Sequence, residues 1–347
     1  MGTQEKSELC FPQLFNMSCK KPAIARSKAV FLHIVLSSVS FLTVALNLLV
    51  IISVSHFRQL HTPTNILLLS LAVSDFLVGL LLSPAEILRS TACWFLGQPT
   101  CLMYIFVSLT VTSASVGIMV LISADRYVAI CDPLNYPIRI TDRRVQLCVC
   151  LCWLCSITFS CFLVRDDLHQ RRKQNSCYGK CVVVVQYIAG VVDLILTFIV
   201  PVTVIIVLYM RVFVVAVSQA RSMRSHATAV RNHLPMTLTK KSELKAARTL
   251  GVLVLVFLMC FCPYYCVSLV GEEFINSSSA SFVAYLFGLN SCLNPLIYAM
   301  FYPWFRKAVK LVVTLQILQP GSSEVTYWLG RLFLEGFWWK MVHLKGA

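Results

Sequence analysis

Long apolar stretches alternate with short polar segments along most of the chain. A helix needs about 20 mostly apolar residues to cross a bilayer. Seven segments meet this requirement, and they lie at residues 29–55, 65–88, 101–124, 147–164, 182–210, 246–270 and 280–301. The pattern therefore predicts an all-α membrane protein, a seven-transmembrane helix bundle.

The composition agrees with this prediction. Of the 347 residues, 58% are hydrophobic and 13% are charged, whereas a soluble domain is usually about 45–50% apolar and about 25% charged. The 30 Lys and Arg against 15 Asp and Glu give a net charge of +15. Because these charges lie between the apolar runs, we expect them to meet anionic membrane lipid and cytosolic partners, and no nucleic acid.

The basic residues also predict an orientation. An odd number of spans places the two termini on opposite sides of the membrane. The third inner loop carries Arg221, Arg224, Arg231, Lys240, Lys241 and Lys245. Under the positive-inside rule, residues 1–28 are then an extracellular tail, without an apolar run that would suggest a signal peptide, and residues 29–301 form the bundle. Asn16 and Asn276, each in an Asn-X-Ser sequence on the outer side, are the expected glycosylation sites.

Charged residues inside the spans are the best indicators of function, because a charge at the bilayer centre costs about 2.5–3.5 kcal/mol on insertion scales. Asp75 lies in the second span, Asp193 in the fifth, and Asp125 with Arg126 at the end of the third. Prolines that permit kinks interrupt four spans, at Pro84, Pro201, Pro263 and Pro295.

Several protein classes build helix bundles of this kind. A transporter is expected to contain internal repeats, and a channel needs a filter loop or rings of like residues. An intramembrane enzyme needs a histidine cluster or a nucleophile beside a base. The first three spans are not repeated in the last three, no filter loop is visible, and the seven histidines are scattered. The sequence favours a signalling receptor that is not an enzyme, with a membrane transporter as the alternative from another class.

Motifs that follow one another along the spans resemble those of one receptor family. They are Asn47, Leu71-Ala-Val-Ser-Asp75, Asp125-Arg126-Tyr127, Trp153, Pro201, Cys260-Phe-Cys-Pro263 and Asn294-Pro-Leu-Ile-Tyr298. The set resembles the landmarks of rhodopsin-like (class A) G-protein-coupled receptors. The segments Leu60-His-Thr-Pro-Thr-Asn65 and Lys240-Lys-Ser-Glu243 narrow the resemblance to trace amine-associated receptors. It implies a plasma-membrane receptor for a small amine that activates a heterotrimeric G protein, stimulatory and raising cyclic AMP.

Two residues depart from this family. Its members usually carry an aspartate for the ligand ammonium eighteen residues before the arginine of Asp-Arg-Tyr, and here that position is Ser108. Eighteen residues are five helical turns, so Ser108 shares a face with Arg126. Gly288 stands where a partner tyrosine is common. Asp193, eight residues before Pro201, resembles an aspartate of a teleost-type olfactory branch, which implies that Asp193 binds the amine instead.

A ligand-binding set follows from this resemblance. Its members are Asp193, Ser108, Thr112, Thr197, Phe261, Tyr264 and Tyr265. Aromatic faces beside a carboxylate suit an alkylammonium, since cation–π contacts add about 0.5–2 kcal/mol. Three alternatives stay open: Asp193 is a structural carboxylate satisfied by Thr197 or water, Phe261 is ordinary packing, or the ligand is not an amine. Glu86 is expected to be a solvated charge at the outer rim.

Two further sets follow from the same resemblance. A polar cluster of Asp75, Ser115, Asn290, Ser291 and Asn294 suits a sodium ion or, alternatively, a hydrated network. We expect no cofactor and no metal beyond that ion. The residues expected to act in G-protein coupling are Asp125, Arg126, Tyr127, Glu243, Tyr209 and Tyr298. In this hypothesis Arg126 pairs with Asp125 and Glu243, and breaking the latter pair frees the sixth span.

The resemblance also implies two disulfide bonds and a short cytosolic eighth helix. Cys101 is expected to pair with Cys181, and Cys177 with Cys19 rather than Cys10. The eighth helix covers residues 302–315 and is amphipathic through Phe305, Val309, Val312 and Val313. Residues 316–347 form a tail unlike that of the family, which is either an artefact of the gene model or an interfacial helix.

Overall fold

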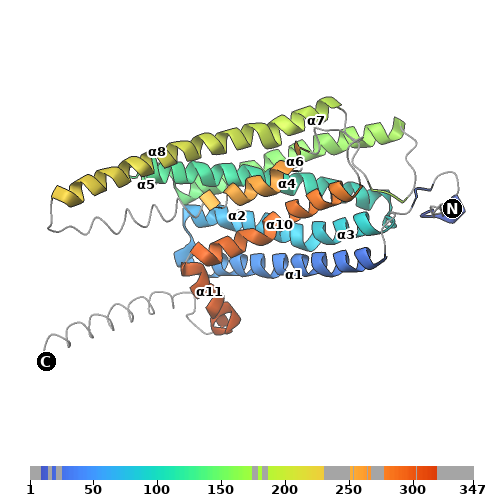
Figure 1. The fold of residues 1–347 in the computed structure, drawn as a ribbon, viewed down its shortest axis with the longest axis horizontal. Helices are drawn as coiled ribbons and strands as arrows, with labels where there is room; N and C mark the ends of the chain where they lie inside the picture. The colour runs from blue at the N-terminus through green and yellow to red at the C-terminus, as the bar shows by residue number, and fades with distance from the viewer. Residues whose placement is uncertain are drawn as a thin grey trace, which may run out of the picture.

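The apolar runs form long helices that lie side by side along the long axis of the molecule (Figure 1). The computed structural model describes residues 9–14, 18–20, 26–173, 179–181, 187–229, 251–252, 254–263, 265–266, 277–301 and 303–318. Within these residues, five helices are long and apolar enough to cross a membrane: Ala29–His56, Pro63–Thr91, Gly97–Cys131, Asp142–Arg165 and Tyr187–Val215. Val254–Pro263, in the sixth predicted span, and α10 (Ser277–Phe301) complete the seven-helix bundle.

The element boundaries extend the predicted spans into the polar flanks. The first five spans consist of α1 (Arg26–His56), α2 (Pro63–Leu77) with α3 (Ser83–Thr91), α4 (Gly97–Cys131), α6 (Asp142–Lys173), and α7 (Tyr187–Leu194) with α8 (Val200–Ala229). Two further helices outside the spans are α5 (Tyr136–Arg139) and α11 (Pro303–Val313). Short 3-10 turns are η1 (Pro12–Leu14), η2 (Arg58–Leu60) and η6 (Gln316–Leu318). The third span was expected at 101–124 but is longer, because a helix continues past the hydrocarbon into the polar interface.

Two of the predicted proline interruptions contain a π-helical turn. The turn η3 (Val78–Leu82) joins α2 to α3, and η4 (Ile195–Ile199) joins α7 to α8. Each turn ends just before a proline, Pro84 or Pro201. Proline lacks an N–H and its ring clashes with the carbonyl four residues earlier, so the wider turn relieves both constraints. As a result, the second and fifth spans each change helical register in their outer half.

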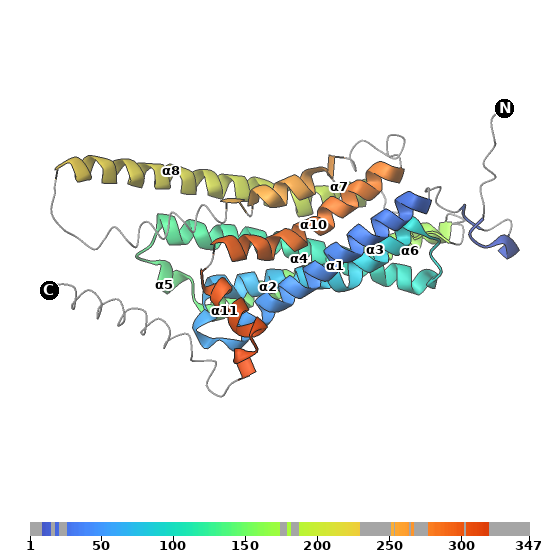
Figure 2. The same cartoon turned by 60° about the horizontal axis from the view of Figure 1, so that its bottom comes forward.

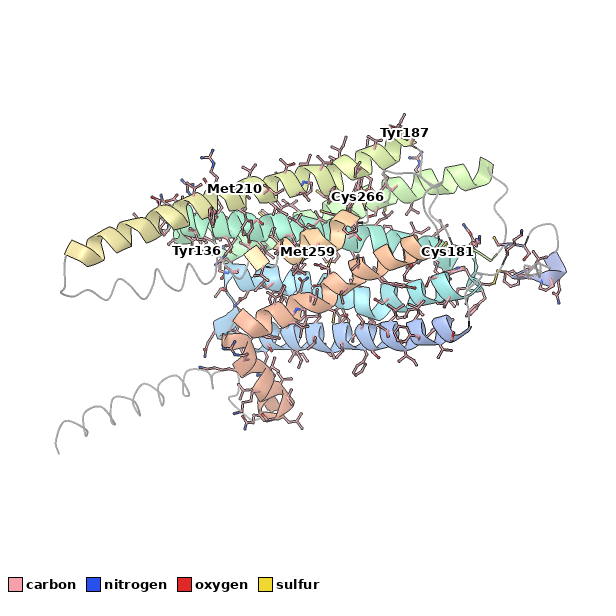
Figure 3. The ribbon with its side chains drawn as sticks, viewed as in Figure 1. Tyr136, Cys181, Tyr187, Met210, Met259 and Cys266 are labelled. Carbon is pink, nitrogen blue, oxygen red and sulfur yellow. A yellow bond between two sulfur atoms is a disulfide. The ribbon has the colours of Figure 1, made fainter. Side chains whose placement is uncertain are left out.

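The helices bury apolar side chains inward and also expose them outward. The main core contains Leu68, Leu71, Ile118, Met119 and Phe257. Large apolar side chains also cover the outside of the bundle, and Figure 3 shows Tyr187 and Met210 pointing away from it. An aqueous surface would not tolerate this exposure on every side, whereas acyl chains do.

The cysteines of the fourth span do not share one environment. Cys152 packs against α4, with its Sγ 3.7 Å from the Ala114 carbonyl oxygen, and it fills the space beside Gly117. Cys148 and Cys155 are free and exposed on the outside of the bundle, as are the neighbouring Cys150 and Cys161. Packing therefore explains Cys152, while the others face the lipid side.

The eighth helix, α11, turns away from the bundle at its inner end (Figure 2). On its inward face, Ala308 and Leu311 pack with Phe57 and Leu60, which follow the end of α1. Phe305, on the same face, is buried in the main core beside Tyr298. Val313, which was expected on the apolar face, is 67% exposed, like other apolar side chains on the outside of the molecule. In a helix of 3.6 residues per turn, the face of Phe305 passes through positions 308 and 312, and Val313 lies beside it.

Candidate ligand cavity and coupling surface

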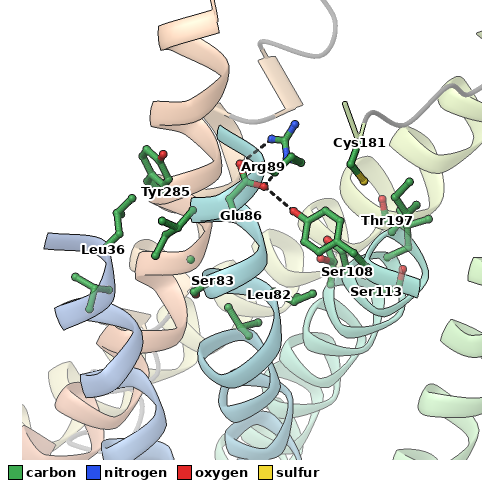
Figure 4. Close-up of a pocket in the computed structure, with 18 of the residues that line it drawn as sticks. Leu36, Leu82, Ser83, Glu86, Arg89, Ser108, Ser113, Cys181, Thr197 and Tyr285 are labelled. Atoms are coloured by element: carbon green, nitrogen blue, oxygen red, sulfur yellow. Dashed lines mark hydrogen bonds and ion pairs between the residues drawn. The ribbon is translucent and has the colours of Figure 1, made fainter. Parts of the chain in front are cut away.

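A cavity of about 330 Å³ lies between the outer halves of the helices. Its polar lining consists of Ser83, Glu86, Arg89, Tyr104, Ser108, Thr112, Ser113, Asp193, Thr197, Tyr265 and Tyr285. Leu36, Val39, Leu82, Ile87 and Leu109 are among its apolar lining residues. Figure 4 shows Glu86 and Thr197 on different sides of this cavity, with Ser108 between them. Mixed lining of this kind suits a small amphipathic ligand.

Most of the predicted ligand-binding residues come together here. Asp193, Ser108, Thr112, Thr197 and Tyr265 all line the cavity. The other two predicted residues differ, because Phe261 is buried and its ring lies 4.2 Å from that of Phe257, outside the cavity lining, and Tyr264 lies outside the described residues. The packing alternative for Phe261 therefore describes its position better.

Asp193 lies at the end of α7, one turn before Thr197 in the π-helical turn. The Thr197 hydroxyl is 2.7 Å from the Asp193 carbonyl oxygen and 3.3 Å from Oδ1 of its carboxylate. The Tyr265 hydroxyl lies 2.9 Å from the same threonine oxygen. No ion pair to Asp193 occurs within the part of the chain that the structure describes. The carboxylate thus faces the cavity with a hydroxyl neighbour and, within the described residues, without a cation.

A second carboxylate in the cavity has entirely different partners. Arg89 donates to Glu86 through two nitrogens, with Nε 2.7 Å from Oε2 and Nη2 2.6 Å from Oε1. The Tyr104 hydroxyl donates to Oε2 at 2.5 Å. Glu86 is 8% exposed, so the expectation of a solvated rim charge was wrong. Its spacing of three residues from Arg89 was readable in the sequence, whereas Tyr104 on another helix was not.

The glycine at the usual tyrosine position widens the cavity. A Cβ placed on Gly288 would have Ser83 Oγ as its nearest neighbour, at 3.9 Å. The cavity therefore reaches between α3 and α10 towards Leu36 of α1. Further out, the Tyr285 and Ser90 hydroxyls lie 2.7 Å apart and connect the same two helices.

Disulfide bonds hold together the segments at the outer end of the cavity. The expected Cys101–Cys181 bond is present, and Cys181 lines the cavity. A second bond joins Cys10 to Cys93. It was not predicted, because no sequence motif links the N-terminal tail to the first outer loop. Cys19 is disulfide-bonded too, and its expected partner Cys177 lies outside the described residues, as do the predicted glycosylation sites Asn16 and Asn276.

Deeper in the bundle, the predicted sodium cluster forms a buried polar group. Asn294 Nδ2 donates to Asp75 Oδ2 at 2.8 Å. Ser115 donates to Ser74 at 2.9 Å rather than to the carboxylate. Among the described residues, Asp75 Oδ1 and the side-chain oxygens of Asn290 and Asn294 have no hydrogen-bond partner. Ser291 is buried beside them, and its carbonyl oxygen accepts from the side chain of Asn47 at 3.0 Å.

At the inner end, Asp125 holds a compact network. Its Oδ2 accepts from Arg126 Nε at 2.9 Å and from the Thr64 hydroxyl at 2.9 Å, and Arg126 Nη2 also contacts Thr64. Its Oδ1 accepts from the Tyr136 hydroxyl at 2.8 Å. Burial and the neighbouring Asp125 carboxylate raise the pKa of Tyr136, which keeps this phenol a donor. Thr64 was missed because it is remote in sequence from Asp125, and Tyr136 was missed because it lies in a separate short helix after the end of α4.

Of the other predicted coupling residues, Tyr127, Tyr209 and Tyr298 are described and Glu243 is not. Tyr298 is 1% exposed and packs edge-on against Phe305, with ring centroids 6.5 Å apart. Tyr127 and Tyr209 are partly buried on α4 and α8. Glu243 lies outside the described residues, so its pairing with Arg126 stays a prediction. Figure 3 shows Tyr136 and Cys181 at opposite ends of the bundle, which separates the inner network from the cavity.

Known proteins are similar to this chain in sequence. Residues 46–298 match the family described as 7 transmembrane receptor (rhodopsin family). Trace amine-associated receptor 13c of Danio rerio is 38% identical over 331 residues, which cover 92% of this chain and 96% of that protein. The chain belongs to the trace amine-associated receptors of the rhodopsin family. Trace amine-associated receptors 1 and 7e of Mus musculus are 35% and 36% identical, with 89% and 91% of this chain and 96% and 91% of those proteins covered.

Membership of this family shows the cellular location and the class of the protein. It is a multi-pass plasma-membrane receptor and not an enzyme. Receptors of this class recognise a small molecule and act through a heterotrimeric G protein. The cavity lies at one end of the bundle and the Asp125 network at the other end.

Proposed function

We propose that this receptor binds a protonated amine and that the Asp193 carboxylate is the main partner of the ammonium group. The observation that carries the proposal is that Asp193 lines the cavity and has no cationic partner among the described residues. An acid inside a membrane bundle is a functional-site candidate by default. The names of the relatives point the same way, since they are called trace amine-associated receptors.

The neighbours of Asp193 suit this role. Thr197 orients the carboxylate and is tied to the Tyr265 hydroxyl, which limits the rotamers of both side chains. A ring beside an ammonium adds cation–π attraction, and Tyr265 has its ring stacked on Phe198 at 4.3 Å. Ser108 and Thr112 of α4 offer hydroxyls in the same cavity. With Ser108 neutral, the ammonium has its anionic partner on the fifth span instead of the third.

The signal is proposed to reach a stimulatory G protein and to raise cyclic AMP, in an olfactory role. The support is the family resemblance together with the position of η4, which follows Asp193 directly. A ligand held there acts on a turn that already departs from α-helical geometry. Movement of the fifth and sixth spans then changes the inner surface, with membrane lipid as the surrounding medium.

We also propose that a sodium ion binds at Asp75. The three buried acceptor oxygens that lack donors in the described structure, on Asp75, Asn290 and Asn294, are hard ligands of the type that such a cation prefers. Ser115 and Ser291 border the same group. Bound sodium would neutralise the carboxylate and favour the resting arrangement of the helices.

A screen of amines on cells that express the receptor tests the ligand proposal. We expect at least one aliphatic or aromatic amine to raise cyclic AMP with wild-type receptor. Asp193→Asn keeps the volume but removes the anion, so potency should fall roughly 30-fold to several thousand-fold, the usual range for truncating a desolvated charge pair. Asp193→Glu keeps the charge and should lose less.

Surface labelling of each variant, run beside the dose–response curves, separates binding from folding. A purely structural Asp193 would lower surface expression and leave potency unchanged among the receptors that reach the membrane. Normal expression of Asp193→Asn with wild-type potency for every active amine would show that the site assignment is wrong. Responses only to carboxylates or neutral odorants would contradict the amine proposal as a whole.

A further inference from the structure

Two carboxylates line the ligand cavity, and within the described residues Glu86 has a cationic partner whereas Asp193 has none. Asp193 has Thr197 as its side-chain neighbour. Glu86 instead accepts two hydrogen bonds from Arg89 and one from Tyr104, all at 2.7 Å or less. Figure 4 shows this second group, on α3 and α4, away from Thr197. The cavity therefore has two chemically different ends.

The pair of Glu86 and Arg89 is closed to a competing ammonium. The planar guanidinium contacts both carboxylate oxygens in a fork, which is the strongest geometry available to these groups. Tyr104 occupies a further acceptor position of Oε2. A primary ammonium that replaced Arg89 would have to break two charge-assisted hydrogen bonds and would leave the guanidinium without its partner.

From this arrangement we infer that Arg89 is a specificity-determining residue that restricts the cavity to ligands with one positive charge. The inference rests on the proposed amine site at Asp193, and it names the class of ligand that this site binds: monoamines with an apolar body. The second charge of an α,ω-diamine would meet either the occupied Glu86 or the like-charged Arg89. Between the two ends lie Leu82, Ile87 and other apolar side chains that suit a hydrocarbon body.

Substituting Arg89 by glutamine tests this inference directly. Glutamine keeps a polar side chain of similar reach but removes the charge, so Glu86 becomes an available anion that is still oriented by Tyr104. The probes are n-hexylamine and hexane-1,6-diamine with their shorter and longer homologues, matched in chain length. Binding is measured as ligand-induced thermal stabilisation of the purified receptor in lipid nanodiscs, which does not depend on G-protein coupling. We expect the ratio of diamine to monoamine affinity to rise at least about tenfold in Arg89→Gln.

Three matched variants control for indirect effects. Arg139→Gln removes another arginine that pairs with a carboxylate, Asp132 at 3.5 Å, but at the inner end of the molecule, so the ratio should not change. Arg89→Lys keeps the charge and should retain the preference for monoamines. In Glu86→Gln/Arg89→Gln the second anion is gone, so the gain for diamines should disappear.

A single Glu86→Gln variant keeps the inference testable if Arg89→Gln does not fold. It leaves the Arg89 cation in the cavity without its carboxylate, so monoamine affinity should fall at least about tenfold. An unchanged ratio in folded Arg89→Gln, a wild-type preference for diamines, or unchanged monoamine binding in Glu86→Gln would each overturn the inference. The proposed function fails separately, because in that case Asp193→Asn would retain monoamine binding whatever the Arg89 variants do.

Discussion

A carboxylate inside a membrane helix needs partners, and the aspartates of this bundle satisfy that need in different ways. Asp125 is bound by an arginine and two hydroxyls, and Asp75 by the side-chain nitrogen of Asn294. Asp193 has only a threonine hydroxyl, at 3.3 Å, among its side-chain partners in the described part of the chain. Of the three, Asp193 is the one that lines the cavity, where it is only partly buried. This position is the physical reason to assign Asp193, and not the other two, to the amine.

Returning an acid to the usual third-span position tests the geometry of the cavity. Ser108→Asp places a second uncompensated carboxylate in the same cavity as Asp193. Two such groups repel each other, so one should stay protonated until a dication binds. We expect the affinity of short diamines to rise about tenfold or more relative to monoamines. The comparison uses Ser108→Asn, which has the same shape without the charge, and equal diamine binding by both variants would contradict the prediction.

At the scale of single residues, the sequence predicted the lining of the cavity best where a residue departs from the pattern of the family. Ser108 and Asp193 were found in that way, and Thr197 and Tyr265 followed from the same family resemblance. Arg89 was not found, because a charge near the end of a span is usually solvated and only the folded structure buries it against Glu86. Side-chain pairs between different helices cannot be read from periodicity within one helix.

At the scale of the helices, apolar run length predicted the spans well and their irregularities less well. The prolines predicted where the second and fifth spans are interrupted. They did not predict that a π-helical turn before each proline would relieve the clash of its ring with the preceding turn. The turn η4 determines which side chains after Asp193 face inward, and Thr197 at its centre is 7% exposed. Because one extra residue in a turn rotates all later side chains by about 100°, such turns decide the cavity lining.

The contact between α4 and α6 depends on a small residue. A methyl group on Gly117 would collide with Cys152 Sγ. We expect Gly117→Ala to destabilise the purified receptor by about 1–3 kcal/mol through overpacking, measured as a lower melting temperature. Gly117→Ala/Cys152→Ala should recover the loss, because the colliding atom is removed.

Gly190 supplies the matched control for this prediction. Its added Cβ would meet nothing within 4 Å, so Gly190→Ala should be neutral or stabilising, by up to about 1 kcal/mol, through helix propensity. If Gly117→Ala were as stable as Gly190→Ala, close packing at this crossing would not be what holds α4 and α6 together.

At the scale of the whole molecule, the sequence predicted the class of protein from a surplus of apolar residues. The structure explains this surplus, because apolar side chains such as Phe41 and Phe213, 72% and 64% exposed, cover the outside of the bundle as well as the core. Contacts between separate segments at the two ends of the bundle were harder to predict. Neither the Cys10–Cys93 bond nor the contact of Tyr136 with Asp125 leaves a local pattern, since each joins segments that are distant along the chain or in a loop.

The Asp125 network should hold the inner surface in its resting arrangement. Tyr136 of α5 and Thr64 of α2 both donate to the Asp125 carboxylate, which also binds Arg126. Tyr136→Phe removes one of these donors without changing shape, and Tyr136→Phe/Thr64→Val removes two. A hydrogen bond to a charged group contributes about 1.5–3 kcal/mol, so ligand-free nucleotide exchange on a panel of G proteins should rise about threefold or more for the single variant and further for the double variant. Tyr187→Phe, an exposed tyrosine at the opposite end, is the control. Equal surface expression with unchanged basal exchange in both variants would mean that these hydroxyls only support folding and do not restrain Arg126.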